Sequence, residues 1–406
     1  MSPQIVSPQP SVPTHSRNAA IDALRGLAIL LVVMHHLGLR IPLKKTFAAD
    51  VLPDWLMRAL NWNGYEAVFV FFVISGFLIT RQALLHWGSL ASIELRDFYA
   101  RRAARIGPCL LVLLAVLSAL HALGFADFTI TREGQSLPRA LLAALGLHLN
   151  WYEGVTGYLP GNWDVLWSLS IEEVFYLGFP LLCLVLRRRW LLLTGLAVLA
   201  GSMPWTHAAL ADNEIWQEKA YLPGMAAIAI GVLAALLADR WRPTRRTTAR
   251  LLGVAGAVGL VLVFCLGKLT WMALRDGYLL LLTVATACLL LAAVQRRDTA
   301  GFWPGTRWLQ RWGKRSYEIY LSHMFVVFPA VALFKASGLA MRWSVLCYPL
   351  VLLVCGVLGA AIDRWLSSPA RCWLDRRLLR SRHAQAPSDK AAAPVHSAKA
   401  LESVKP

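Results

Sequence analysis

Apolar runs recur along the chain and are separated by shorter polar, often basic, segments. A helix of about 18–22 apolar residues is long enough to cross the ~30 Å hydrocarbon core of a bilayer. The pattern therefore predicts an all-α fold, a polytopic transmembrane bundle of about ten helices. The predicted spans are residues 20–38, 65–84, 106–124, 165–186, 190–204, 221–238, 250–267, 274–294, 316–335 and 344–364.

Other segments fit this pattern less well. The run at 190–204 is the shortest of the predicted spans, and the apolar segment 137–150 is too short to cross, so we expect it to be re-entrant or interfacial. The Pro- and Ser-rich residues 1–18 are expected to form a disordered tail, and residues 19–367 a membrane domain. Residues 368–406 are expected to form a basic, largely disordered cytoplasmic tail.

The composition changes this picture little. Of the 406 residues, 57% are hydrophobic and 16% are charged, which is too apolar for an ordinary soluble domain. The seven cysteines lie singly, without a CxxC pair. We interpret them as helix-packing residues rather than disulfide partners or metal ligands, and we expect no bound metal.

The net charge of +18 first suggests a nucleic-acid partner. In a membrane protein, however, Lys and Arg gather in cytoplasmic loops, so we expect no nucleic acid. With a cytoplasmic N-terminus and a segment 137–150 that does not cross, about 30 of the 41 basic residues lie on the cytoplasmic side. The opposite assignment for the later spans would turn the basic loops around 187–189, 240–250 and 296–315 outward. We therefore expect both termini in the cytoplasm, with the chain in a bacterial inner membrane.

Two ionisable side chains lie on the first predicted span. Arg25 and His36 are eleven residues apart, a rotation of about 1100°, which is within about 20° of three turns. They therefore share one helix face, about 16 Å apart along the axis, whereas His35 is about 100° off that face. Because an ionisable group in hydrocarbon costs several kcal/mol unless it is paired or lines a cavity, this pair is a functional hypothesis.

Two further clusters follow. Residues 71–78 read Phe-Phe-Val-Ile-Ser-Gly-Phe-Leu, in which the small Ser75 lets a helix or a ligand approach closely; packing and ligand contact both stay open. Arg102 and Arg105 are three residues apart and can project from one helix face. Their guanidinium groups suit phosphate oxygens, although arginines at the cytoplasmic edge also serve simply to set orientation.

The fourth cluster reads Trp-Asp-Val-Leu-Trp-Ser-Leu-Ser-Ile-Glu-Glu-Val-Phe-Tyr over residues 163–176. Ser168 and Glu172 are four apart on one helix face. The Glu172 carboxylate could orient an imidazole or bind sugar hydroxyls, or it could be the buried partner of an arginine such as Arg25. Trp163 would suit sugar stacking or an aromatic belt at the membrane interface.

The fifth cluster, residues 312–323, reads Trp-Gly-Lys-Arg-Ser-Tyr-Glu-Ile-Tyr-Leu-Ser-His. Tyr320 and His323 are three apart on one face. They could contact a substrate or form hydrogen bonds across the bundle, and both alternatives stay open. The chain has no HExxH, GxSxG or phosphate-binding glycine loop, so a metalloprotease, a serine hydrolase or an ATPase finds no support.

Together the five clusters resemble the integral-membrane acyltransferases of the acyltransferase 3 type, which O-acylate cell-envelope sugars and related products. The resemblance covers residues 20–365 and rests on the order and spacing of the motifs. The family carries a cation ten intervening residues before a catalytic histidine, which here selects His36 over His35. One departure is that residues 67–69 read Ala-Val-Phe where the family usually has Gly-Val-Asp. Any role of that Asp in acceptor binding is therefore absent here or taken by Glu66.

The resemblance also implies roles for individual residues. His36 would be the general base, since an imidazole with a pKa of about 6.5 can take a proton from a hydroxyl near neutral pH. Glu172 would be catalytic too, by orienting His36 or binding the acceptor. The residues implied to bind the acyl-CoA donor are Arg25, Arg102, Arg105, Tyr320 and His323. The residues implied to contact the acceptor substrate are Ser75, Trp163 and Ser168.

The expected function is transfer of an acyl group, expected to be acetyl, from acetyl-CoA or another acyl-CoA to a hydroxyl of an envelope carbohydrate or lipid-linked glycan. O-antigen and exopolysaccharide are examples of such an acceptor, and direct transfer and a covalent acyl intermediate both stay open. Two other classes stay open as well. A transporter or flippase of a lipid-linked glycan or small metabolite would also need intramembrane charges, but the sequence lacks inverted repeats or paired broken helices. In a membrane scaffold, the charges would be structural pairs.

Overall fold

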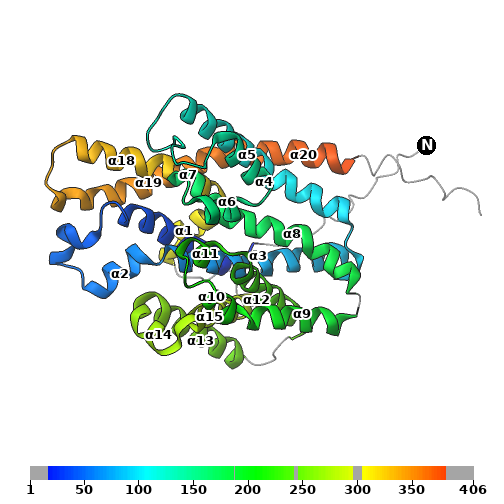
Figure 1. Ribbon diagram of the computed structural model, residues 1–406. Coiled ribbons are helices and arrows are strands. Elements are labelled where there is room, and N and C mark those ends of the chain that lie inside the picture. The colour runs from blue at the N-terminus through cyan, green and yellow to red at the C-terminus, as the bar shows by residue number, and fades with distance from the viewer. Residues whose placement is uncertain (1–16, 187, 242–245, 296–303, 381–406) are drawn as a thin grey trace, which may run out of the picture.

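The computed structural model describes residues 17–186, 188–241, 246–295 and 304–380, which form helices joined by turns and short loops (Figure 1). None of these residues lies in a strand, which confirms the predicted all-α fold. The long helices are α1 (Ala19–Gly38), α3 (Gly64–Trp87), α4 (Leu95–Ala122), α8 (Leu166–Val185), α12 (Tyr221–Arg240), α13 (Arg246–Cys265), α15 (Tyr278–Gln295) and α19 (Cys347–Ile362). The shorter helices are α2 (Asp54–Trp62), α5 (Leu137–Leu145), α6 (Leu149–Thr156), α7 (Gly161–Asp164), α9 (Arg189–Gly201), α10 (Met203–Ala208), α11 (Glu214–Lys219), α14 (Gly267–Leu274), α16 (Arg307–Lys314), α17 (Ser316–Ser322), α18 (Met324–Ala336) and α20 (Ser368–Arg380).

The number of candidate spans is close to the prediction. In the described part of the chain, eight helical segments are long and apolar enough to cross a membrane, and α17 with α18 would be a ninth. These two helices bend by 46° at a break that contains His323. The predicted span at 190–204 differs, because α9 has only 13 residues and rises about 20 Å, less than the ~30 Å core. Segment 137–150 contains α5, which is too short to cross.

The predicted tails lie mostly outside the described residues, which begin at 17 and end at 380. Within the C-terminal segment, residues 368–380 form α20, which packs against α4. All seven cysteines are free thiols.

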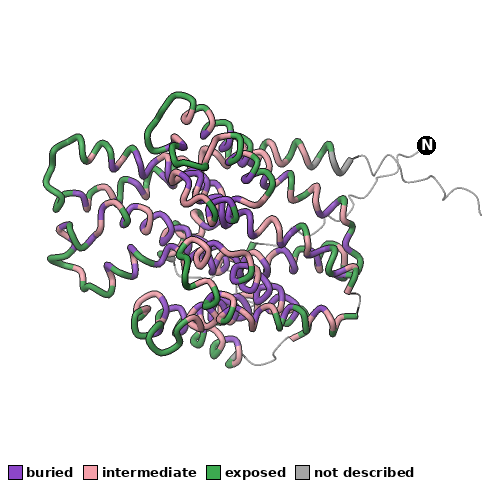
Figure 2. Tube along the Cα trace, viewed as in Figure 1, coloured by how far each residue is buried: buried purple, intermediate pink, exposed green. Residues whose placement is uncertain are grey.

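Large apolar side chains cover much of the outer surface of the bundle. Leu111 and Val112 of α4 and Val254, Val258 and Val261 of α13 are examples of exposed side chains. The buried residues gather instead where the helices meet (Figure 2). An apolar surface of this extent is unfavourable in water and is expected against lipid, so the fold is that of an integral membrane protein.

Glycines allow close contacts between two helix pairs. Gly76 of α3 and Gly231 of α12 lie against each other's helix backbone, and so do Gly26 of α1 and Gly313 of α16. A Cβ atom at any of these positions would collide with a backbone carbonyl oxygen of the other helix. Small residues therefore permit the approach, as is typical of membrane helix pairs. Gly26, which makes the α1–α16 contact, directly follows Arg25 in the chain. The contact therefore holds the Arg25 side chain beside the α16–α17 region.

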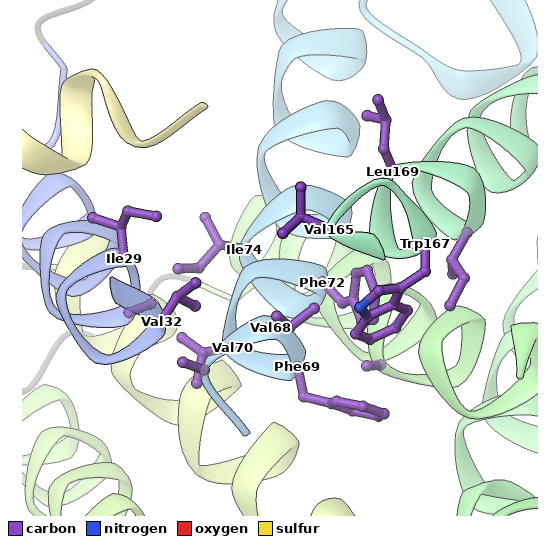
Figure 3. Close-up of a cluster of buried hydrophobic side chains, with 14 of the residues drawn as sticks. Ile29, Val32, Val68, Phe69, Val70, Phe72, Ile74, Val165, Trp167 and Leu169 are labelled. Atoms are coloured by element: carbon purple, nitrogen blue, oxygen red, sulfur yellow. The ribbon is translucent and has the colours of Figure 1, made fainter. Parts of the chain in front are cut away.

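An apolar core joins α1, α3 and α8 (Figure 3). Ile29 and Val32 of α1 lie toward Ile74 of α3, and Trp167 of α8 meets Phe72 edge to face at 6.1 Å between ring centres. These side chains are buried. Packing of this kind holds the three helices in fixed relative positions, and they carry half of the predicted site residues.

Candidate active site

A narrow cavity of about 90 Å³ lies inside the bundle between α1, α3, α4, α8 and α17. Its polar lining residues are Arg25, Ser75, Arg102, Arg105, Ser168, Glu172, Tyr176, Ser316, Tyr317 and Tyr320. All five sequence clusters contribute to this cavity, and every predicted site residue lines it except His36, His323 and Trp163. The fold therefore brings together motifs that are up to about 300 residues apart in the chain, as long connections between packed helices allow.

A hydrogen-bonded chain runs along one wall of the cavity. Glu172 accepts a hydrogen bond from the Tyr176 hydroxyl at 3.4 Å, and the same hydroxyl forms a short hydrogen bond with Ser75 Oγ. Since Tyr176 has one hydroxyl proton, which it donates to Glu172, Ser75 is the donor to Tyr176. Sequence reasoning missed Tyr176, although its position four residues after Glu172 places both on one helix face.

The arginines in the cavity have different contacts. Arg25 Nη2 donates to Ser316 Oγ at 2.8 Å, and within the described residues it forms no ion pair with Glu172 or any other carboxylate. The Arg102 guanidinium lies 4.2 Å from the centre of the Tyr176 ring, a cation–π contact. The structure thus gives Glu172 a tyrosine as its hydrogen-bond partner and leaves Arg25 without a charged one.

Tyr320 joins α17 to the start of α8. Its hydroxyl donates to the carbonyl oxygen of Val165 at 3.0 Å and lies 2.8 Å from Ser168 Oγ. Because the tyrosine proton goes to the carbonyl, Ser168 is the donor to Tyr320. These bonds are the hydrogen bonds across the bundle that the sequence allowed, and they place the Tyr320 ring in the cavity wall.

His36 and His323 face each other next to Tyr320. Their ring centres are 5.0 Å apart, and those of Tyr320 and His323 are 6.0 Å apart. His323 Nδ1 lies 2.7 Å from the backbone oxygen of Tyr320. A carbonyl only accepts, so Nδ1 carries the proton and Nε2 of the neutral ring holds a lone pair. This Nε2 is buried and has no hydrogen-bond partner.

The neighbouring His35 has a different environment. Its Nδ1 donates to the backbone oxygen of Asn61 at 2.9 Å, and its ring meets Trp62 edge to face at 6.3 Å. His35 therefore contacts the end of α2, whereas His36 contacts the broken helix at His323. Trp163 is completely buried in the core, with its indole Nε1 unpaired, so in this structure its ring presents no face to a ligand.

A larger cavity of about 920 Å³ adjoins the narrow one, and Arg25, Leu78, Arg105 and Tyr317 line both. We call this larger cavity the basic vestibule. Its charged lining residues are Arg17, Asp22, Arg25, Arg81, Arg105, Arg311, Lys314, Arg315, Glu318, Asp363 and Arg371. The vestibule lies between the start of α1 and the end of α3. We call this end of the bundle the inner end, and the opposite end the outer end.

The basic vestibule carries excess positive charge. Eight of its lining side chains are basic and three are acidic. Among the described residues, only Arg17 and Arg315 of these eight form ion pairs with carboxylates, at 3.3 and 3.4 Å. A concave surface with unpaired cations attracts polyanions. The basic loop around 296–315 served in the sequence analysis as a determinant of topology, which gave no sign that Arg311, Lys314 and Arg315 line a cavity.

A buried ion cluster lies at the outer end. Lys219 of α11 is 1% exposed. Its ammonium group donates to Glu153 Oε2 at 2.8 Å and to Asp164 Oδ1, and it lies 4.3 Å from the centre of the Tyr158 ring. These contacts tie α6, α7 and α11 together. In the part of the chain that the structure describes, no three His, Cys, Asp or Glu side chains form a group that could hold a metal ion.

The comparison with known proteins supports the family resemblance. The sequence profile of the acyltransferase 3 family, described as an acyltransferase domain, matches residues 18–362. The O-acetyltransferase OatA of Staphylococcus aureus (strain NCTC 8325 / PS 47) is 25% identical over 380 residues, which cover 86% of this chain and 57% of the relative. The putative O-acetyltransferase SACOL0978 of S. aureus (strain COL) is 25% identical over 334 residues, 76% of this chain and 50% of the relative.

The chain thus spans about half the length of these curated relatives. No solved structure matches it. The family match nevertheless extends over most of the chain and contains all five motif clusters, in a fold whose helices can cross a membrane. The chain therefore belongs to the acyltransferase 3 family, as its motifs predict.

Proposed function

We propose that the protein is a membrane O-acyltransferase that moves an acyl group, expected to be acetyl, from acyl-CoA to a hydroxyl of an envelope carbohydrate. One observation carries this proposal above the others. The basic vestibule and the narrow cavity share Arg25 and Arg105 in their linings, and the wall of the narrow cavity includes Tyr320 beside the two facing imidazoles. The names of the S. aureus relatives support acetyl as the group and a hydroxyl oxygen as its acceptor.

The two joined cavities match the two ends of an acyl-CoA. The nucleotide end carries three phosphate groups and is bulky, which suits a vestibule of about 920 Å³ lined by eight basic side chains. The pantetheine arm is slender and uncharged, which suits the narrow cavity of about 90 Å³. Arg105 lines both, at the junction. Because acyl-CoA is made in the cytoplasm, we place the vestibule and both termini on the cytoplasmic side of an inner membrane.

The chemistry follows from the imidazole pair. His36 takes the proton of the acceptor hydroxyl while the oxygen attacks the thioester carbonyl carbon. The C–S bond then breaks, and the CoA sulfur leaves as a thiol with the proton returned by His36. The His323 ring, whose Nε2 holds a lone pair, has its centre 5.0 Å from that of His36, and we assign it the stabilisation of the imidazolium that forms between the two steps.

The other predicted residues serve the substrates. Glu172 makes no hydrogen bond to His36 in the described structure but ends the hydrogen-bonded chain through Tyr176 and Ser75. We therefore place it in the wall that contacts the substrates rather than behind the base. A pantetheine arm contains two amides that need partners when they leave water, and the polar groups of Ser75 and Ser168 in the cavity wall can supply them.

Replacing His36 by Ala tests the proposal. Removal of a general base is expected to lower acyl transfer by about 10²- to 10⁴-fold. The measurement is acetyl transfer from labelled acetyl-CoA by the purified protein, together with mass spectra of envelope glycans from cells at matched protein levels. His86→Ala, which alters an exposed imidazole at the inner end, is the control and should keep full activity. Acylation that persists unchanged in the His36 variant would show that His36 is not the general base.

A further inference from the structure

A third cavity, of about 820 Å³, opens at the outer end of the bundle. It lies between α2, the start of α3 and the turn that joins α13 to α14, and α2 and α14 occur at the same end of the bundle in Figure 1. We call it the outer groove. Its aromatic and polar lining residues are Lys44, Asp54, Trp55, Arg58, Asn61, Trp62, Asn63, Glu66 and Lys268. The function proposed above does not use this groove.

Two tryptophans on α2 form one side of the outer groove. Trp55 and Trp62 are seven residues apart, about 20° short of two helical turns, so they share one face of α2. They are 50% and 47% exposed. An indole with half its surface free can receive the apolar face of a ring, while nearby polar groups bind the edge of that ring. Side chains of this kind suit the C–H faces of a saccharide.

The polar side chains of the groove can bind hydroxyl groups. Glu66 Oε1 accepts a long hydrogen bond of 3.5 Å from Tyr278, and its Oε2 is buried without a partner. A buried carboxylate oxygen without a donor is unfavourable, and a ligand hydroxyl would supply one. The lining holds three cations and two carboxylates, which favours a neutral or weakly acidic ligand over a polyanion.

The wall of the outer groove also lies close to the proposed base. The backbone oxygen of Asn61, in the groove wall, is hydrogen-bonded to His35, and the His35 and His36 ring centres are 5.4 Å apart. The wall of the groove is thus one imidazole away from His36, on the side of the molecule opposite the basic vestibule. A chain of sugar units in the groove would lie near the base, with His35 between them, and would not compete with the donor for the vestibule.

We propose that the outer groove binds the acceptor glycan, a neutral or weakly acidic saccharide chain that stacks on Trp55 and Trp62 and donates a hydrogen bond from one of its hydroxyl groups to the Glu66 carboxylate. This inference rests on the proposed function where it identifies the saccharide as the acyl acceptor. The binding of a saccharide in the groove does not itself depend on catalysis. It also gives Glu66 the role that the absent family aspartate at residues 67–69 left open.

The test measures binding of defined tetrasaccharides to the purified full chain in lipid nanodiscs. Cellotetraose, chitotetraose and a tetrameric glucuronide are titrated into the wild type, Trp55→Ala/Trp62→Ala and Glu66→Gln, with acyl-CoA binding measured in parallel. For at least one saccharide we expect the double variant to lose about tenfold or more in affinity, with acyl-CoA binding unchanged. Trp205→Ala removes a more exposed tryptophan outside the groove and should keep the wild-type saccharide affinity.

Three results would overturn the groove assignment. The wild type could bind none of the three saccharides, the double variant could bind them as tightly as the wild type, or Trp205→Ala could weaken binding equally. If the double variant folds poorly, Trp55→Phe/Trp62→Phe keeps an aromatic face, and retained binding there with loss in Glu66→Gln supports the proposal. Failure of the proposed function appears separately, because His36→Ala would then keep acylation while saccharide binding still depends on the groove.

Discussion

The charged side chains at the two ends of the bundle have opposite environments. At the inner end, eight basic side chains line the vestibule, and in the described structure only Arg17 and Arg315 of them pair with a carboxylate. At the outer end, Lys219 is almost fully buried between Glu153 and Asp164, within 2.8 Å of the first. Basic side chains therefore line a cavity, mostly without carboxylate partners, at one end, and a basic side chain is paired within the core at the other.

This difference separates charges that await a ligand from charges that hold the fold. Cations that line a cavity without partners keep their field for an incoming anion. The charge of a buried cation between two carboxylates is already neutralised by them. Removing one partner leaves an uncompensated charge in a medium of low dielectric. We therefore expect variants at the two ends to fail in different ways, the outer ones in stability and the inner ones in donor binding.

The largest expected effect is on stability, from Lys219→Met. This change keeps the volume of the side chain but leaves Glu153 and Asp164 close together without their cation. Breaking a buried ion pair in this way is expected to destabilise the fold by about 3–5 kcal/mol. The measurement is the thermal unfolding midpoint of the purified protein in detergent, with protein level in cells as a second readout.

Lys335→Met, at an exposed position near the end of α18, is the control and should unfold like the wild type. The triple variant Lys219→Met/Glu153→Gln/Asp164→Asn should recover part of the loss, because it removes the stranded carboxylates as well. If Lys219→Met instead melts like the wild type and loses acyl transfer, the outer cluster belongs to the active site and the contrast between the two ends is wrong.

The next effect concerns the donor. Arg81→Ala and Arg105→Ala, both in the lining of the vestibule, are each expected to raise the KM for acyl-CoA by about 10- to 100-fold, since a hydrogen bond to a charged group contributes about 1.5–3 kcal/mol. The unfolding midpoint should stay near that of the wild type, because neither side chain forms an ion pair among the described residues. Added salt should raise the KM of the wild type, because it screens the contacts between the arginines and the phosphates. The difference in KM between the wild type and the variants should therefore become smaller as the salt concentration rises.

A truncated donor sharpens this test. S-acetyl-pantetheine lacks the nucleotide and its phosphates, so wild type and arginine variants should use it equally poorly. Arg58→Ala in the outer groove is the control and should keep the wild-type KM for acyl-CoA. An equal loss with both donors would show that the arginines support the cavity rather than bind phosphate.

Seven of the ten polar residues that line the narrow cavity could be named from the sequence, because helical spacing orders side chains within one span. Ser168 and Glu172 at four residues and Arg102 and Arg105 at three lie on common helix faces, and all four line the narrow cavity. The all-α fold and the family follow from the same local patterns. Spacing also separated His36 from His35, which the structure places in different surroundings.

Contacts between distant segments were not predictable in this way. Lys219 meets partners 55 and 66 residues away, and no local period links a short helix such as α11 to α6 and α7. The basic residues of the vestibule could not be told from topology determinants, because their charge gives the same signal in either role. The short α9 looked like a span because its apolar run continues, after a break, into α10.

The smallest expected effect is from Tyr320→Phe, in the wall of the narrow cavity between the two ends. The change removes one hydroxyl that donates to Val165 and accepts from Ser168, which is expected to cost about 0.5–1.5 kcal/mol of stability. His323 is bonded to the backbone oxygen of Tyr320 rather than to its side chain, so the imidazole pair should keep its geometry.

Acyl transfer should therefore fall by no more than about tenfold in this variant, with kcat/KM and the unfolding midpoint measured together. Tyr317→Phe, which loses one hydroxyl bond to the backbone oxygen of Ile106, is the matched control for stability. If Tyr320→Phe abolishes transfer like His36→Ala while melting like Tyr317→Phe, the Tyr320 hydroxyl takes part in the chemistry. The wall of the narrow cavity at Tyr320 would then be a third functional region, and Tyr320 would be more than a structural link between the donor end and the acceptor end.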